Sequence, residues 1–279
     1  MKEKFKRFLH YLYISVRKPE MEVLPGNLAF FFMMMLIPVV TVIATILANI
    51  DVGKATVYDA LITSFPDNIA TLIASISGSG STNSTWVILS ASLLLASNGT
   101  YSMIVTSNSI YEIKKTSYIK NKIKSVILVI ILVMLFIFLL IIPTISNKVL
   151  NMIASLTKTD MATNIYFTLY NVLKYPVIFL LVFVFITILY KFTPSGKKRK
   201  RTSYGAIFTS VLLVIVTWGY SFYIDYFSSY ETIFGGISSI LFLMLWIYII
   251  SYIFVLGMNM NAAREKIINE NIKKEKSIE

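Results

Sequence analysis

Residues 123–145 read IKSVILVIILVMLFIFLLIIPTI, and this stretch decides the fold class of the chain. It contains no charged residue between Lys124 and Pro143. A helix of about 20 apolar residues is long enough to cross a hydrocarbon core about 30 Å thick. The stretch therefore predicts a membrane-spanning helix.

Five more apolar segments of similar length lie on either side of it. Of the 279 residues, 56% are hydrophobic and 14% are charged, whereas soluble globular chains carry about 25% charged residues. We therefore predict an all-α polytopic membrane helix bundle, formed as one membrane domain with a charged tail at 262–279. The first run is longer than a signal-peptide core, so we expect it to be retained. The six predicted spans cover roughly 28–50, 86–106, 123–145, 168–190, 204–226 and 235–260.

The second predicted span is unusually polar for a helix that faces lipid. Small and hydroxyl residues let membrane helices approach one another closely, so we expect this span to lie inside the bundle. Its polar residues are Ser90, Ser92, Ser97, Asn98, Thr100, Ser102, Thr106 and Ser107.

Basic residues are distributed unevenly between the predicted connections. Of the 26 lysines and arginines, 22 lie in the N-terminal segment, the 107–124 loop, the 191–203 loop and the tail. Loops rich in Lys and Arg stay in the cytoplasm, so both termini are predicted to be cytoplasmic. The exceptions, predicted to lie outside, are Lys54, Lys148, Lys158 and Lys174.

The outer connection at 54–76 has apolar residues at mostly three- and four-residue spacing, interrupted by Pro66. That pattern predicts an amphipathic, broken helical segment at the outer face. The glycine- and serine-rich stretch 77–81 after it is typical of a hinge. A weaker helical pattern occupies 146–167. Prolines and glycines at Pro25-Gly26, Pro38, Pro143, Pro176 and Gly235-Gly236 indicate either helix starts and stops or breaks that form a pocket.

Residues for catalysis are scarce. The chain has no cysteine and one histidine, His10, which lies in a basic segment before the first span. The carboxylates are scattered through loops and tails, without the clusters that metal-dependent hydrolysis needs. We therefore predict that the protein is not an enzyme and has no metal or cofactor.

Polar residues in or near the spans have two interpretations. They line a substrate pathway open to the cytoplasm, or they form hydrogen bonds across helices, which are worth roughly 1 kcal/mol or less each. The candidates for the pathway are Asn27, Asn98, Asn108, Tyr190 and Asn259, with Asn261 nearby.

Charged residues give two more candidate sites. Lys174, Asp225 and Glu231 form an outer gate in one interpretation, and meet water among the headgroups in the simpler one. The run Lys197, Lys198, Arg199, Lys200 and Arg201 follows a span directly, which favours contact with anionic lipid headgroups on the cytoplasmic side over binding to nucleic acid.

Local patterns along the whole chain resemble the YihY/BrkB family of membrane proteins. The first is the run Ala29–Pro38, AFFFMMMLIP, which is similar to the family's Ala-Tyr-Tyr run ending at a proline. The others, in the family's order, are LYKFTP at 189–194, Gly205-Ala206, Gly235-Gly236, LWIY at 245–248 and LGMN at 256–259. The chain departs from the family where Phe30 and Phe31 replace tyrosines, where Met35 replaces a serine, and where the 197–201 basic run replaces a tryptophan.

The resemblance implies a six-span protein of the plasma or inner membrane, described as a transporter. It also implies that the ribonuclease label once given to family members is a misattribution. Our first hypothesis is a transporter or lipid-handling protein for an amphipathic or anionic envelope component. The alternative is a non-transporting membrane scaffold in envelope assembly.

Overall fold

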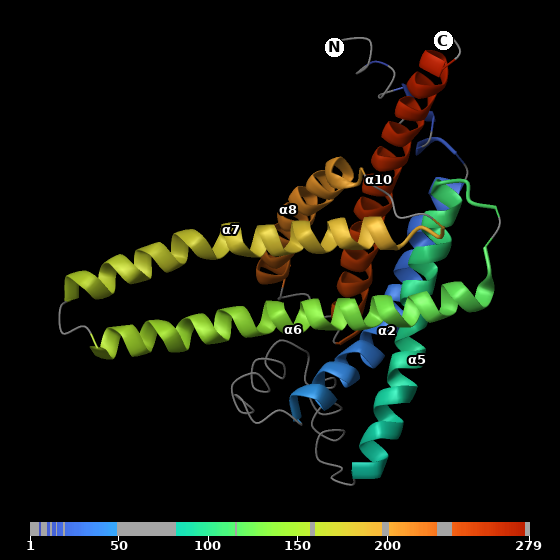
Figure 1. The fold of residues 1–279 in the computed structure, drawn as a ribbon. Helices are drawn as coiled ribbons and strands as arrows, with labels where there is room; N and C mark the ends of the chain where they lie inside the picture. The colour runs from blue at the N-terminus through green and yellow to red at the C-terminus, as the bar shows by residue number, and fades with distance from the viewer. Residues whose placement is uncertain are drawn as a thin grey trace. The chain divides into compact units, whose positions relative to one another are not determined.

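The computed structural model describes residues 6, 10, 11, 13, 14, 16–18, 20–48, 82–114, 116–156, 160–196, 201–227 and 236–276. The predicted helical segment at 54–76 lies outside these residues, and it stays a prediction. All regular secondary structure in the described residues is helical, which confirms the all-α prediction (Figure 1). The helices are α2 (Glu20–Ala48), α5 (Thr82–Ile110), α6 (Tyr118–Leu156), α7 (Asp160–Phe192), α8 (Ser203–Phe227) and α10 (Gly236–Lys276).

Several of these helices have the length and composition of membrane spans. In the described ranges, four qualify: Met21–Ile43 in α2, Tyr118–Phe138 in α6, Ser203–Tyr220 in α8 and Leu241–Glu270 in α10. A shorter apolar stretch, Pro176–Phe192, lies in α7. Six helices match the six predicted segments in order, while the number that cross the membrane stays a prediction.

The helices are longer than the apolar segments that predicted them. The 39 residues of α6 give a length of about 58 Å at about 1.5 Å per residue, nearly twice the hydrocarbon thickness. Most of the 146–167 connection belongs to the end of α6 and the start of α7. The charged tail continues α10 as far as Lys276.

The four prolines named in the sequence analysis lie inside helices. Helix α2 runs through Pro25 and Pro38, α6 through Pro143 and α7 through Pro176. Their interpretation as starts and stops is therefore wrong, although α10 does begin at Gly236. A proline removes one backbone donor, which neighbouring helices and side chains can compensate in a membrane bundle.

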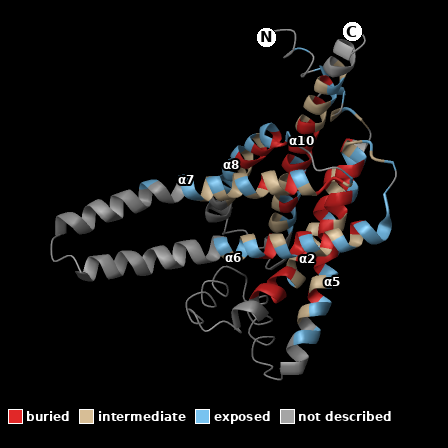
Figure 2. Ribbon diagram, in the orientation of Figure 1, coloured by how far each residue is buried: buried red, intermediate tan, exposed pale blue. Residues whose placement is uncertain are grey.

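Burial differs from the pattern in a soluble protein, because many large apolar side chains are exposed while the buried core contains both apolar and hydroxyl side chains. Large apolar side chains such as Trp218, Phe222 and Ile119 are exposed, as expected of helix faces that contact lipid. Figure 2 shows where the buried residues lie along the helices. Serines and threonines are among them. The prediction for the second span is confirmed for most of its polar residues, since Ser92, Ser97, Thr100, Ser102, Thr106 and Ser107 are buried.

The chain divides into two compact units. The first comprises Met1–Met33, Gly99–Ile123 and Val182–Glu279, and the second comprises Met34–Asn98 and Lys124–Leu181. Within the first unit, α8 packs along α10. The polar contacts described below all belong to the first unit.

Candidate functional site

Helix α5 ends in a tight corner formed by backbone hydrogen bonds. The Glu112 N–H donates to the Ser109 carbonyl at 3.1 Å, and the Ile113 N–H donates to the Asn108 carbonyl at 2.8 Å. This pair of bonds is the Schellman motif, whose left-handed position usually holds glycine. Here Glu112 occupies it, with φ of 55°. Non-glycine residues in this strained conformation cluster at functional sites, so the contacts of the Glu112 side chain are described next.

The Glu112 side chain is paired with Lys18 from the turn before α2. Lys18 Nζ donates to Glu112 Oε1 at 2.7 Å, and both side chains are partly exposed. This hydrogen bond holds the pKa of the Glu112 carboxyl below its ordinary value. The carboxylate is therefore charged and neutralised by its partner at neutral pH.

A relay of hydrogen bonds connects the end of α5, the turn after α7 and the first turn of α6. The Ser195 N–H donates to Asn108 Oδ1 at 2.8 Å, and Asn108 Nδ2 donates to Ser195 Oγ at 2.9 Å. The Ser195 hydroxyl donates in turn to Asn121 Oδ1 at 2.8 Å. The relay fixes three segments that are far apart in the sequence.

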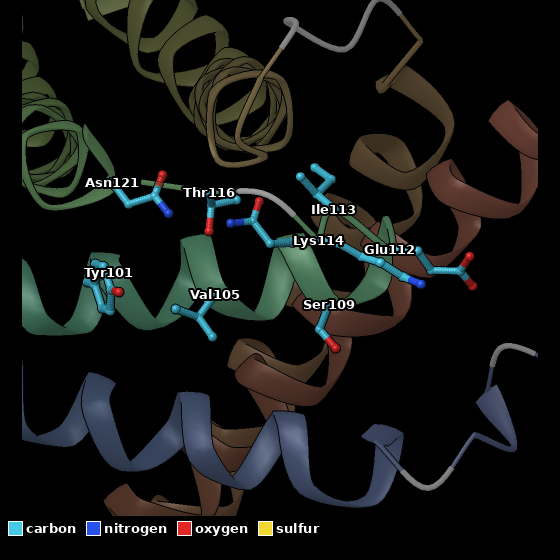
Figure 3. Close-up of a pocket in the computed structure, with 9 residues that line it drawn as sticks. Tyr101, Val105, Ser109, Glu112, Ile113, Lys114, Thr116 and Asn121 are labelled. Atoms are coloured by element: carbon cyan, nitrogen blue, oxygen red, sulfur yellow. The ribbon is translucent and has the colours of Figure 1, made fainter. Parts of the chain in front are cut away.

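Beside this relay lies an open hollow of about 350 Å³, shown in Figure 3. Its lining changes character along α5, from Tyr101 and Val105 to the polar Ser109 and then to the charged residues after the helix. The Tyr101 ring packs edge-on against Tyr118, with centroids 5.6 Å apart. The complete lining is Tyr101, Val105, Asn108, Ser109, Glu112, Ile113, Lys114, Thr116 and Asn121.

A second polar cluster lies between α7, α8 and α10. The Tyr190 hydroxyl lies 2.6 Å from Thr209 Oγ1 and donates to the Phe254 carbonyl at 2.8 Å. Tyr190 is only 1% exposed. Its hydrogen bonds thus join the three helices within the core.

Helices α8 and α10 are in close contact next to this cluster. A Cβ atom added at Gly205 would overlap the Gly257 carbonyl oxygen, and one added at Gly257 would overlap Thr209 Oγ1 and the Tyr190 hydroxyl. The Gly205 N–H donates to Asn261 Oδ1 at 2.8 Å, across the two helices. Glycine at both positions lets the backbones approach, as is common between membrane helices.

The predicted pathway residues lie in different environments. Asn108 belongs to the relay beside the hollow, and Tyr190 to the α7–α8–α10 cluster. Asn259 is buried and donates to the Val255 carbonyl at 3.0 Å and to the Met21 sulfur at 2.8 Å. Asn27 and Asn98 are exposed. The pathway and its alternative, hydrogen bonding across helices, both stay predictions.

The charged candidates are mostly outside the described parts of the structure. Lys174 and Asp225 lie in α7 and α8, where their side chains are not described, and Glu231 lies outside the described residues. Of the basic run, 197–200 also lies outside, and Arg201 is exposed. Neither the gate nor the lipid contact is tested.

Sequence reasoning did not identify the hollow. It named Asn108 as a pathway candidate and otherwise used the 107–124 segment to assign sidedness. It did not name Tyr101, Glu112, Asn121 or Ser195 as site residues. The relay joins residues 74 and 87 positions apart, so no local pattern predicts it. The signal that was present locally is the polar end of the second span.

Comparisons with known proteins match the chain along nearly its whole length. A model of the family described as virulence factor BrkB matches residues 15–278. The chain is 25% identical over 273 residues to the Bacillus subtilis ribonuclease-like protein YfkH, covering 95% of this chain and 98% of that protein.

Two further relatives match over a short segment. A UPF0761 membrane protein of Xanthomonas campestris is 38% identical over 68 residues, which are 24% of this chain and 16% of that protein. A UPF0761 membrane protein of Xanthomonas oryzae is 35% identical over a segment of the same length, with the same coverage. No solved structure matches the chain.

Proposed function

This chain belongs to the virulence factor BrkB family of membrane proteins, and we propose that it transports or otherwise handles a lipid-like, anionic component of the cell envelope. The observation that carries the proposal is the hollow beside α5. Its lining combines exposed apolar side chains, polar groups and charged groups in one continuous surface. A molecule that fits such a surface has an apolar part and a polar, charged part.

The length of the hollow supports an amphipathic ligand. Within α5, the lining runs from Tyr101 to Ser109, which is about 12 Å at the helical rise of about 1.5 Å per residue. The headgroup layer on each side of a bilayer is only about 5–8 Å thick. A hollow that starts among the headgroups therefore extends to the acyl chains.

The charge of the chain supports an anionic ligand at the cytoplasmic side. Most of the 26 basic residues fall in connections expected to face the cytoplasm, including the run from Lys197 to Arg201. Such segments attract anionic lipid, with about 1 kcal/mol for each basic residue near the surface. The expected setting is the plasma or inner membrane, with both termini inside and membrane lipids as partners.

The scaffold hypothesis also has an observation in its favour. The contact of Gly205 with Gly257, and the hydrogen bonds of the buried Tyr190, fix α7, α8 and α10 against one another. A membrane scaffold needs this rigidity and needs no ligand. If α7, α8 and α10 are fixed in this way, a transport pathway does not pass between them. The test of transport therefore uses the hollow beside α5.

The test compares two substitutions on α5. Val105→Trp places a large side chain in the hollow, and Val87→Trp places the same side chain on an exposed position outside its lining. The full-length protein is reconstituted in liposomes that contain fluorescent phosphatidylglycerol, and movement of the label between leaflets is followed by chemical quenching. Wild type and Val87→Trp should accelerate this movement over protein-free liposomes, and Val105→Trp should slow it several-fold.

Failure of the wild-type protein to bind or move the lipid would refute the proposal and favour the scaffold. Equal rates for the two variants would show that the hollow does not take part.

Catalysis forms no part of the proposal. The ribonuclease-like name belongs to the Bacillus relative. In the ranges that the structure describes, no three His, Cys, Asp or Glu residues lie close enough together to hold a metal ion. Purified protein should therefore cleave no RNA once contaminating nucleases are removed. Cleavage that depends on one carboxylate of this chain would contradict this.

A further inference from the structure

We infer that residues 11–18 form a strap that latches the corner at the end of α5 through Lys18 and Glu112, and that salt releases this latch. The latch rests on contacts within the first compact unit. Its effect on lipid movement rests on the proposed function, because Glu112 also lines the hollow.

The chain on either side of Lys18 is fixed to α10. The Tyr11 hydroxyl lies 2.7 and 2.9 Å from the two carboxylate oxygens of Glu270, and Lys266 Nζ lies 5.5 Å from the centre of the Tyr11 ring. Met21 Sδ accepts a hydrogen bond from Asn259 Nδ2 at 2.8 Å. Tyr11 precedes Met21 by about as many residues as Glu270 follows Asn259, so this part of the chain runs antiparallel to α10.

Hydrogen bonds of the backbone also order the chain around Lys18. The Lys18 carbonyl accepts from the Met21 N–H at 2.9 Å, which joins the strap to the first turn of α2. Within the strap, the Arg17 N–H donates to the Tyr13 carbonyl at 3.1 Å. From this backbone the Lys18 ammonium reaches Glu112 Oε1 at 2.7 Å. The strap therefore connects α10 to the end of α5.

Glu112 occupies the position of the corner that is least favourable for its residue type, with φ of 55°. A non-glycine residue in the left-handed conformation is disfavoured by a factor of about 5–30 in an equilibrium constant. An exposed ion pair offsets up to about fivefold of this factor. The ion pair therefore changes measurably how often the corner opens.

The exposure of the latch makes it sensitive to salt. The Lys18 and Glu112 side chains are 40% and 61% exposed. At an ionic strength of about 1 M, charges at a protein surface are screened beyond about 3 Å. Figure 3 shows the Lys114 side chain beside Glu112, where its ammonium can take the place of Lys18. Salt therefore weakens the hold of the strap on the corner.

Release of the latch changes the polar end of the hollow. Glu112, Ile113 and Lys114 follow α5 and all line the hollow. The N–H groups of Glu112 and Ile113 also form the two backbone bonds of the corner. A corner that opens more often therefore lets these lining residues move away from the end of α5.

The first test is amide exchange at Glu112 and Ile113 in the full-length protein in detergent, corrected for the intrinsic rate of each residue. Lys18→Gln should speed this exchange about three- to fivefold. The matched control is Lys114→Gln, which removes a lysine beside the same carboxylate but not its bonded partner, and it should change exchange less than about twofold. Sodium chloride at about 1 M should speed exchange in the wild type and leave Lys18→Gln unchanged.

Two substitutions at Glu112 separate the strained backbone from the ion pair. Glu112→Ala and Glu112→Gly both remove the carboxylate, but only glycine adopts a positive φ without strain. Glu112→Ala should therefore speed exchange at least as much as Lys18→Gln does. Glu112→Gly should exchange no faster than the wild type, and Lys18→Gln should have no effect in the Glu112→Gly background. These side chains are exposed, and thermal unfolding checks that each variant folds.

Equal exchange in Lys18→Gln and Lys114→Gln would overturn the latch, and equal exchange in Glu112→Ala and Glu112→Gly would overturn the role of strain. Wild-type exchange that does not respond to salt would overturn the release by salt.

The lipid-movement assay tests the link to the hollow. Lys18→Gln should speed movement about two- to fivefold, and Lys120→Gln, an exposed lysine outside the lining, should leave it unchanged. Equal rates for these two variants would overturn the link. Absence of movement in the wild type would refute the proposed function alone, because the exchange results do not depend on it.

Discussion

Replacing Gly257 by alanine should destabilise the α8–α10 contact even though the change adds one methyl group. The new Cβ would overlap Thr209 Oγ1 and the Tyr190 hydroxyl. Overpacking of this kind costs about 1–3 kcal/mol. Displacing the Tyr190 hydroxyl also breaks its bonds to Thr209 and the Phe254 carbonyl, at about 0.6 kcal/mol each for a helical membrane protein.

The helix propensity of alanine offsets part of this loss. Alanine is favoured over glycine in a helix by about 1 kcal/mol, so the net loss for Gly257→Ala is about 1–3 kcal/mol. Gly219 in α8 is the matched control, because no described atom lies within 4 Å of a Cβ added there. Gly219→Ala should therefore leave stability unchanged or raise it by up to about 1 kcal/mol.

The assay is reversible unfolding of the full-length protein in mixed detergent micelles, followed by tryptophan fluorescence. Thr209→Ala in the Gly257→Ala background should recover part of the loss, because it removes one of the overlapping atoms. The reasoning fails if Gly257→Ala is as stable as Gly219→Ala.

Three further predictions concern the ends of the helices. Because the pKa of Glu112 is lowered, the stabilisation from its Lys18 partner is present above the ordinary carboxyl pKa and is lost as the pH falls through the lowered value. This stabilisation is at most about 1 kcal/mol, and amide exchange at the end of α5 measures it. Glu112→Gln should remove the dependence of that exchange on acid pH. Tyr11→Phe should speed amide exchange in the N-terminal segment, since the Tyr11 hydroxyl donates to the Glu270 carboxylate at 2.7 Å, and an unchanged rate would count against that contact. Cysteines placed singly at Ser81 and Ser117 in this cysteine-free chain should label from opposite sides of the membrane; labelling of both from one side would contradict the six-span topology.

The helices could be predicted from the sequence, but their ends could not. Hydropathy identifies the part of a helix that is apolar enough to lie in hydrocarbon. It does not detect the polar turns that extend the same helix beyond that part. Residues 262–276 show this, since they continue α10 with Ala263 and Ile267 buried on one face. Their four-residue spacing was a helical signal that the high charge of the tail obscured.

The candidate site was less predictable for a different reason. Asn108 was named because it is a polar residue near a span, but its partner Ser195 lies 87 residues away. The Ser195 hydroxyl donates in turn to Asn121, which is 74 residues away in the sequence. Such information resides in tertiary contacts, and no pattern within one segment contains it.

The bond from the Gly205 N–H to Asn261 has a consequence for the order in which the protein is made. Gly205 lies in the first turn of α8, where backbone N–H groups have no partner within their own helix. Its acceptor is 56 residues further along the chain. At roughly 5–20 residues per second, the ribosome adds these residues in about 3–11 s. Until Asn261 has been made, the Gly205 N–H lacks this acceptor, so water or another hydrogen-bonding group satisfies it before α10 packs against α8.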